Sequence, residues 1–200
     1  MRINKFLSSL GIASRRAIDK YIEEGRIKVN GVIASTGIDV TEEDEIYIDN
    51  KKIETNRIEE KVYFMLNKPL EVLSASSDDR GRKTVVDLIK TDKRIFPIGR
   101  LDYMTSGLIL LTNDGELFNR LVHPKSEIYK KYYIKVFGEV KKEEIEELKK
   151  GVLLEDGKTL PAKVSGIKYD KNKTSMYISI REGRNRQIRR MIEKFEYKVL

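Results

Sequence analysis

The spacing of apolar residues over the first 48 positions predicts two short helices followed by a small sheet. One helical face repeats at intervals of three and four residues: Ile3, Phe6, Leu7 and Leu10. Gly11 is expected to end this helix and Ser14 to cap a second one. Residues 26–29 then alternate and meet Asn30-Gly31, a strong signal for a β-hairpin, and a further strand is expected at 45–48. The pattern therefore predicts a compact helix–helix–sheet module.

A polar segment at 49–60 predicts a linker, which divides the chain into a module at 1–58 and a larger domain at 59–200. In the larger domain we expect strands at 62–66, 95–98, 108–111, 132–137 and 176–180, and helices at 85–89, 116–121, 143–150 and 188–195. The runs at 95–98 and 108–111 are candidates for buried strands, although they are too short and too uniformly apolar to be assigned by their period alone.

The composition excludes several kinds of chemistry. The chain has no cysteine and a single histidine, which argues against disulfides, thiol catalysis, a zinc site and a histidine-based triad. We therefore expect no metal and no cofactor. His123 precedes Pro124 at a predicted helix end, where it suits a capping or packing role. A long apolar run and a signal peptide are both missing from the sequence, so we expect a cytoplasmic protein without a membrane partner.

Positive charge is concentrated in parts of the chain. The net charge is +8, and residues 181–190 hold five arginines against one glutamate. Clusters of this kind suit the phosphate backbone of a nucleic acid, although a solvated charged face is an equally good interpretation of any one cluster.

A glycine-bracketed loop offers the strongest candidate for chemistry. Asp102 lies in the string Gly99-Arg100-Leu101-Asp102, between two apolar strands, where a scaffold presents catalytic groups. Taken alone, an aspartate in a loop is more often a turn or cap residue. The string, however, closely resembles the signature of the ribosomal pseudouridine synthases that carry an N-terminal RNA-binding domain. Further matches follow at Thr105, Gly107, 110–115 and His123-Pro124.

The resemblance covers nearly the whole chain. Residues 1–48 look like the alpha-L RNA-binding motif, and Asn67-Lys68-Pro69 resembles the strand that opens the family's catalytic domain. Lys131-Tyr132 looks like the tyrosine motif, and 182–191 is similar to the third motif. The resemblance implies an α+β fold: the small helix–helix–sheet module, then a mixed, largely antiparallel β-sheet domain of the pseudouridine synthase type.

The same resemblance implies the site residues. The catalytic carboxylate falls on Asp102, the active-site tyrosine on Tyr132 rather than Tyr133, and the basic partner of the carboxylate on Arg189. The residues expected to contact RNA are all basic: Arg15, Arg16, Arg26, Lys28, Arg100, Arg184, Arg186 and Arg190.

Two positions depart from the family's pattern. Glu71 stands where the family usually has glycine, so the turn after Lys68-Pro69 is expected to differ in shape. The sequence ends at Leu200, whereas the family normally continues, so the chain is either truncated or can do without that tail.

The chemistry suits these residues. Isomerising a uridine breaks the N1–C1′ bond and joins C5 to C1′, and a carboxylate can attack C1′ or act as a base at the sugar. Tyr132 can stack on the base or relay a proton at C5. In a helix through Ile188, Arg189 lies about 100° from the apolar centre, whereas Arg186 and Arg190 face solvent. We therefore expect the Arg189 guanidinium within roughly 3–4 Å of the Asp102 carboxylate, with Tyr132 in the same pocket.

Other functions are weighed against this one. A non-catalytic RNA-binding or ribosome-assembly protein on the same scaffold is the alternative, but such a protein would be free to lose the three site residues. A metal-dependent nuclease would need clustered acids, and Asp102 has no acidic neighbour in its own loop. The expected partner is ribosomal RNA, with the large subunit favoured, or a ribosome assembly intermediate, and we expect a monomer.

Overall fold

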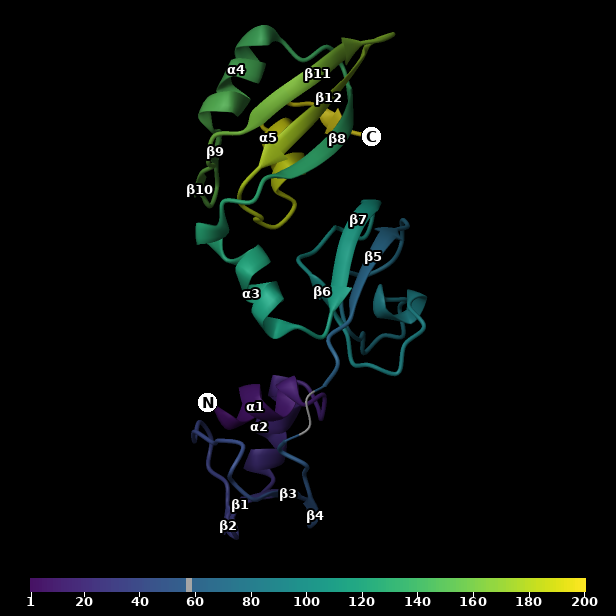
Figure 1. The fold of residues 1–200 in the computed structure, drawn as a ribbon. Helices are drawn as coiled ribbons and strands as arrows, with labels where there is room; N and C mark the ends of the chain where they lie inside the picture. The colour runs from purple at the N-terminus through teal and green to yellow at the C-terminus, as the bar shows by residue number, and fades with distance from the viewer. Residues whose placement is uncertain (57–58) are drawn as a thin grey trace. The chain divides into compact units, whose positions relative to one another are not determined.

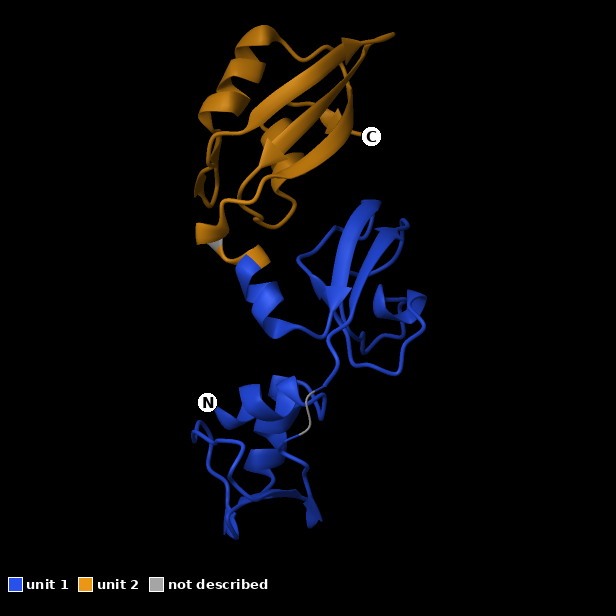
Figure 2. Cartoon of the chain, viewed as in Figure 1, with its two compact units in different colours: residues 1–120 blue, residues 121–200 orange. Residues whose placement is uncertain are grey.

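The computed structural model describes residues 1–56 and 59–200, which form two compact units, 1–120 and 121–200 (Figure 2). Both units mix short helices with antiparallel sheets, which confirms the predicted α+β class. The predicted boundary between residues 58 and 59 adjoins residues 57–58, which lie outside the described residues. A division after residue 120 falls within helix α3 (Gly115–Val122) and was not expected from the sequence.

The first 53 residues form the predicted helix–helix–sheet module. Helices α1 (Ile3–Ser9) and α2 (Arg15–Glu23) pack on a sheet of order β2-β1-β3-β4, and the Ser14 side chain caps α2 by accepting from the Ala17 amide at 3.0 Å (Figure 1). The strands are β1 (Ile27–Val29), β2 (Val32–Ile33), β3 (Ile46–Ile48) and β4 (Lys51–Lys52). Asn30 and Gly31 both have positive φ, so the predicted hairpin turn is confirmed.

The predicted linker at 49–60 is wrong over its first part. Asp49 and Asn50 both have positive φ and turn the chain into β4, which pairs with β3. The Ile53 amide then donates to the Ile46 carbonyl at 2.8 Å, and the Ile53 side chain packs against the core of the module. The lysines of this hairpin face solvent, so the segment has a polar composition that did not indicate a strand.

A three-stranded sheet of order β5-β7-β6 follows in the same unit. Its strands are β5 (Tyr63–Lys68), β6 (Phe96–Ile98) and β7 (Gly107–Thr112), and the 3-10 turn η1 (Val86–Leu88) packs on it. The strand expected at 108–111 is present as β7 and is buried on one face only: Ile109 and Leu111 are buried, whereas Leu108 is 67% exposed. After β7, Asp114 accepts from the amides of Glu116 and Leu117 and so caps α3.

The unit at 121–200 has the order β8-α4-β11-β12-α5-β13. Its strands β8 (Lys130–Phe137), β11 (Lys163–Tyr169), β12 (Lys173–Ile180) and β13 (Lys198–Val199) form an antiparallel sheet of order β11-β12-β8-β13. This is the split βαβ arrangement. Helices α4 (Lys142–Lys150) and α5 (Gln187–Glu193) share one core with the inward residues of β8 and β12, so both helices cover one face of the sheet (Figure 1).

Two small elements complete this unit. The hairpin of β9 (Leu153–Leu154) and β10 (Gly157–Lys158) was not predicted, nor were β11 and β13. The turn η2 (Pro124–Ser126) lies before β8, and His123 Nδ1 accepts from the Lys125 amide at 3.2 Å, which agrees with the predicted capping role. Among the residues described, no helix combines the length and the apolar character needed to cross a membrane.

Candidate active site

The main chain of the Asp102 loop is held on both sides of the aspartate. The Ser74 hydroxyl donates to the Leu101 carbonyl at 2.9 Å and accepts from the Leu101 amide at 3.0 Å. On the other side, the Thr105 amide donates to the Asp102 carbonyl at 2.9 Å. The Asp102 side chain itself is half-buried and makes no hydrogen bond or ion pair with the residues described. The backbone is therefore fixed while the carboxylate is left for another partner.

Lys68 lies beneath this loop and is fully buried. Its ammonium donates to the carbonyls of Pro69 and Val72, each at 2.8 Å, and at 3.4 Å to that of Tyr103, the residue after Asp102. Burial lowers the pKa of Lys68, while the negative charge of Asp102 acts in the opposite direction and favours the ammonium. A buried cation thus ties the end of β5 to the Asp102 loop and makes the potential at the carboxylate more positive.

Glu71 keeps the turn that a glycine would make. Its φ is +61°, in the left-handed region, and its amide donates to the Tyr103 carbonyl at 2.8 Å. This is a backbone conformation that glycine adopts readily, and the expected difference from the family's turn stays a prediction. Glutamate accepts a conformation that costs about 1 kcal/mol for a residue with a Cβ, and the hydrogen bond to the Asp102 loop offsets that cost.

Tyr132 and Tyr133 point to opposite faces of the sheet at 121–200, because consecutive residues of a strand alternate. Tyr132 packs with the core on the face that carries α4 and α5. Tyr133 lies on the other face, 58% exposed and opposite Tyr177. The choice of Tyr132 over Tyr133 therefore selects the tyrosine on the helix-covered face.

Arg189 is half-buried on α5, and its side chain makes no hydrogen bond or ion pair with the residues described. The buried residues of α5 are Gln187, Met191 and Ile192, so the apolar centre differs slightly from the one predicted at Ile188. Arg189 still lies beside this face, as expected. Arg189 and Tyr132 thus share the helix-covered face of one sheet, whereas Asp102 belongs to the other unit. The predicted approach of Arg189 to Asp102 joins the two units and stays a prediction.

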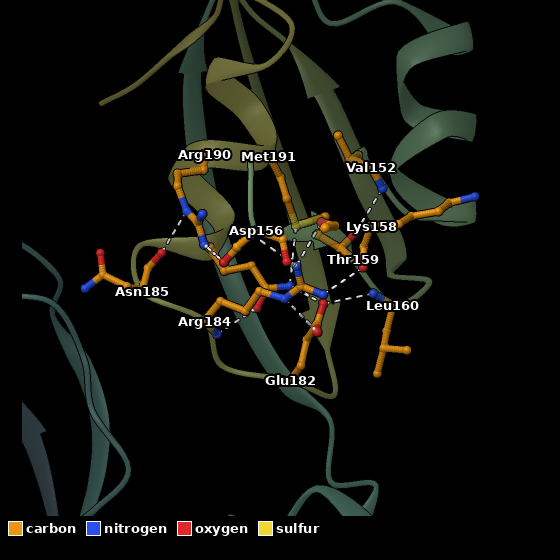
Figure 3. A network of polar contacts seen from close by, with 12 residues as sticks. Val152, Asp156, Lys158, Thr159, Leu160, Glu182, Arg184, Asn185, Arg190 and Met191 are labelled. Atoms are coloured by element: carbon orange, nitrogen blue, oxygen red, sulfur yellow. Dashed lines mark hydrogen bonds and ion pairs between the residues drawn. The ribbon is translucent and has the colours of Figure 1, made fainter. Parts of the chain in front are cut away.

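Two of the arginines expected at the RNA are engaged inside the protein (Figure 3). The Arg184 guanidinium donates to the carbonyls of Gly157 and Lys158 at 2.9 and 2.7 Å, and to Glu182 at 3.1 Å. Asp156 accepts from Arg184 at 3.2 Å and from Arg190 at 2.9 Å. The prediction that Arg190 faces solvent is therefore wrong: its charge is neutralised by Asp156, and together the two arginines fasten the turn before α5 to the β9–β10 hairpin.

The other basic residues expected to contact RNA fall into two groups, those that bond within the protein and those that are exposed. In the N-terminal module, the Arg26 guanidinium binds both oxygens of Asp49, at 2.8 and 2.5 Å, and lies 4.0 Å from the centre of the Tyr21 ring. Lys28 donates to the Asn50 side chain at 3.4 Å. Four arginines, by contrast, are exposed: Arg15, Arg16, Arg100 and Arg186. Arg186 has only a long ion pair, 3.9 Å, to Glu193.

The role of Lys68 was missed in the sequence, although a signal was present. Phe64 and Leu66 occupy the inward positions of β5, and the same alternation points Lys68 inward. A lysine at an inward position has to donate to buried acceptors, which predicts carbonyl oxygens or a carboxylate nearby. The hydrogen bonds between Ser74 and the Leu101 main chain could not be predicted from the sequence in this way, because the two residues are 27 positions apart.

Comparison with known proteins assigns both parts of the chain to known families. Residues 62–194 match the family model for RNA pseudouridylate synthase, and residues 1–46 match that of the S4 domain. The chain is 50% identical over 203 residues to the ribosomal large subunit pseudouridine synthase B of Bacillus subtilis (strain 168), covering all of this chain and 82% of the relative. It is 38% identical over 200 residues to the dual-specificity RNA pseudouridine synthase RluF of Escherichia coli (strain K12), covering 100% of this chain and 67% of the relative.

A solved structure gives the same assignment. The crystal structure of a pseudouridylate synthase aligns with a TM-score of 0.67 at 31% identity, over all of this chain and 85% of that one. The chain therefore belongs to the RNA pseudouridylate synthase family. It is an RNA pseudouridine synthase with an S4 domain at its N-terminus, which confirms the resemblance stated from the sequence.

Proposed function

We propose that this protein converts a specific uridine of ribosomal RNA, in the large subunit, to pseudouridine, with Asp102 as the catalytic carboxylate. The observation that carries the proposal is the family match over 62–194, which contains the clamped loop of Asp102. The printed names of the relatives, one a large-subunit enzyme and one of dual specificity, support ribosomal RNA as the substrate.

In the proposed reaction the N1–C1′ bond breaks, the base turns, and C5 bonds to C1′. The C5 proton is lost and N1 gains a proton, so the reaction is an isomerisation that needs no oxidant. Asp102 either attacks C1′ and holds the sugar covalently or removes a proton from it. Both roles require an ionised carboxylate.

Tyr132 and Arg189 complete the proposed site from the other unit. In this proposal the Tyr132 ring stacks on the flipped uracil, and its hydroxyl moves the C5 proton. Arg189, whose guanidinium is unpaired within the described residues, supplies a permanent positive charge beside Asp102. The exposed Arg15, Arg16, Arg100 and Arg186 contact phosphates, while Arg184, Arg190 and Arg26 act on RNA only by shaping the segments they hold.

The test is pseudouridine mapping of rRNA transcripts incubated with the purified protein. We expect one modified uridine in the large-subunit transcript and none in the small-subunit transcript. Asp102→Asn is expected to lower the rate by more than about a thousand-fold while RNA affinity stays within a few-fold, since the change is nearly isosteric. Asp79→Asn, at an exposed position of the same unit, is the matched control and is expected to keep the full rate.

Each outcome bears on a separate part of the proposal. More than a few per cent of the rate in Asp102→Asn would remove Asp102 from the catalytic role. A modified uridine in the small-subunit transcript alone would move the substrate to that subunit, and no modification in either would contradict ribosomal RNA as the substrate.

A further inference from the structure

The sheet at 121–200 has one face without a helix. The inward residues Ile134, Val136, Met176 and Ile178 pack under α4 and α5, and the residues that alternate with them point the other way. We call this second surface, formed by the outward side chains of β11, β12, β8 and β13, the open face. Figure 1 shows its strands in front of α5.

The open face is strongly basic. Six exposed lysines occupy outward positions on its four strands: Lys131, Lys135, Lys163, Lys168, Lys173 and Lys198. The four strands contain no aspartate or glutamate, although the chain has 32 acidic residues. A face that only keeps the protein solvated would mix the two signs, as the exposed side of α4 does with its glutamates and lysines. The nearest acids along the chain, Glu139, Asp170, Glu182 and Glu196, all lie beyond the strand ends.

Aromatic rings lie among these lysines. Tyr133 and Tyr177 face each other across β8 and β12 with ring centres 5.4 Å apart, and they are 58% and 39% exposed. Phe137, further along β8, is 53% exposed. The Lys131 ammonium lies 4.4 Å from the centre of the Tyr177 ring. Exposed rings held between cations provide a surface on which bases stack while the cations meet phosphates.

The basic surface continues beyond one end of the sheet. The Lys163 ammonium lies 3.9 Å from the centre of the Tyr129 ring, and the Arg181 guanidinium lies 5.6 Å from it. Arg181 directly follows β12 and begins the arginine-rich turn that leads to α5. Cations and aromatics therefore connect the open face with that turn, with one acid among them, since Arg181 also pairs with Glu127 at 2.9 Å.

We propose that the open face binds a single-stranded segment of RNA, with bases stacked on Tyr133 and Tyr177 and phosphates at the surrounding lysines. The identity of this RNA as part of the substrate rests on the proposed function. The contact is separate from the uridine site, because Tyr132 points to the opposite face of the same sheet. A second copy of this chain is a poor occupant, since two faces with six lysines each would repel one another. A four-stranded sheet with aromatics on its helix-free face is also a known way to read unpaired bases.

The experiment measures binding of a fluorescent oligouridine of about twelve nucleotides to the full chain as a function of salt. Lys135→Gln combined with Lys168→Gln is expected to weaken binding roughly tenfold and to reduce the log–log salt slope by about 1.4, the value for two phosphates on a single strand. Lys142→Gln with Lys150→Gln, two exposed lysines of α4, is the matched control and is expected to change neither.

The aromatic pair is tested separately. Tyr133→Thr with Tyr177→Thr keeps residues that favour strands and is expected to weaken binding about tenfold with an unchanged salt slope. Because the chain has no tryptophan, Tyr133→Trp adds a single reporter whose emission is expected to fall when oligouridine binds. Unchanged tryptophan emission at saturating oligouridine would overturn the proposal even where the threonine variants fail to fold.

The remaining outcomes separate this proposal from the proposed function. Both open-face variants are expected to keep the rate of pseudouridine formation at saturating rRNA within about twofold. Wild-type affinity for oligouridine in the lysine variant would overturn the open-face proposal, whatever the enzyme does to rRNA. A sedimentation change on substitution, with unaltered RNA binding, would mark the face as a protein interface and overturn it as well. A wild-type protein that binds oligouridine through this face but modifies no rRNA would contradict the proposed function alone.

Discussion

Two segments that carry the candidate chemistry are held in opposite ways. The Asp102 loop is fixed through its main chain, by Ser74 on one side and by the buried Lys68 beneath it, and its one functional side chain stays unpaired within the described residues. The arginine-rich turn before α5 is fixed through its side chains instead, since Arg184 and Arg190 are occupied by carbonyls and by Asp156.

The difference shows that residue type does not identify a functional side chain. Five arginines lie between residues 181 and 190, and the structure uses at least two of them to build the turn that presents Arg189. Near Asp102, the buried Lys68 ammonium bonds to carbonyl oxygens rather than to the carboxylate. In both segments the residue proposed for catalysis makes no side-chain hydrogen bond or ion pair with the described residues of its own unit.

The largest effect that sharpens this contrast is expected at Arg189. Arg189→Met should lower the turnover rate by about 10²–10³-fold, as losing a preorganised charge does, while thermal stability stays unchanged. Turnover on rRNA and thermal unfolding of the same preparation measure both. Lys194→Met, at an exposed lysine directly after α5, serves as the control and should leave the turnover rate intact. A lower melting temperature with normal turnover in Arg189→Met would show that Arg189 stabilises the turn, as Arg184 and Arg190 do, and takes no part in catalysis.

Arg184 is expected to behave in the reverse manner. Arg184→Ala removes charge-assisted bonds to Glu182 and Asp156 and leaves carbonyls of the β9–β10 hairpin without donors. We expect the free energy of unfolding to fall by about 2–3 kcal/mol. The loss in the free energy of RNA binding should be smaller than this. Denaturant unfolding followed by RNA titration of the folded fraction gives both values. Equal stability and a large loss of RNA affinity would instead place Arg184 at the RNA.

A smaller effect on stability is expected at Lys68. Lys68→Met removes three hydrogen bonds to carbonyls but also the cost of burying an ammonium, so we expect a loss of about 1–2 kcal/mol. The turnover rate should fall as well, because the Asp102 loop loses its anchor and its nearby positive charge. Lys83→Met, an exposed lysine of the same unit, is the comparison. Full activity in Lys68→Met would show that the hydrogen bonds of Ser74 and Thr105 hold the main chain of the Asp102 loop without Lys68.

The smallest effect concerns pH. The hydrogen bond from Arg190, opposed by burial and aided by Arg184, lowers the pKa of Asp156 below its usual value. Because the pKa of Asp156 is lower in the folded state, the ion pair contributes fully to stability above the unfolded pKa of about 3.9. This contribution is lost as the pH falls through the folded pKa. The difference in melting temperature between the wild type and Asp156→Asn should therefore be present at pH 6 and shrink below about pH 4. A difference independent of pH would show that the Asp156 charge plays no part in holding the turn.

Local rules were enough for much of the fold. The helical repeat from Ile3 to Leu10, the Ser14 cap, the Asn30-Gly31 hairpin and the strands of 132–137 and 176–180 were all visible in the sequence. Each depends on residues a few positions apart, where propensity and period decide. The elements that were missed, β4, β9, β10, β11 and β13, are short or polar strands stabilised by partners distant along the chain.

For the site, the sequence by itself determined which residues to consider, because the strings around Asp102, Tyr132 and Arg189 resemble those of a known family, to which the chain belongs. It also determined that Tyr132 and Tyr133 face opposite sides, since a strand alternates. Only the tertiary structure decided that Lys68 supports the Asp102 loop, that Arg184 and Arg190 build a turn, and that six lysines and a tyrosine pair gather on one face. Those outcomes depend on which strands become neighbours, and pairing between distant segments follows from burial and closure of the whole sheet, which no local window of sequence contains.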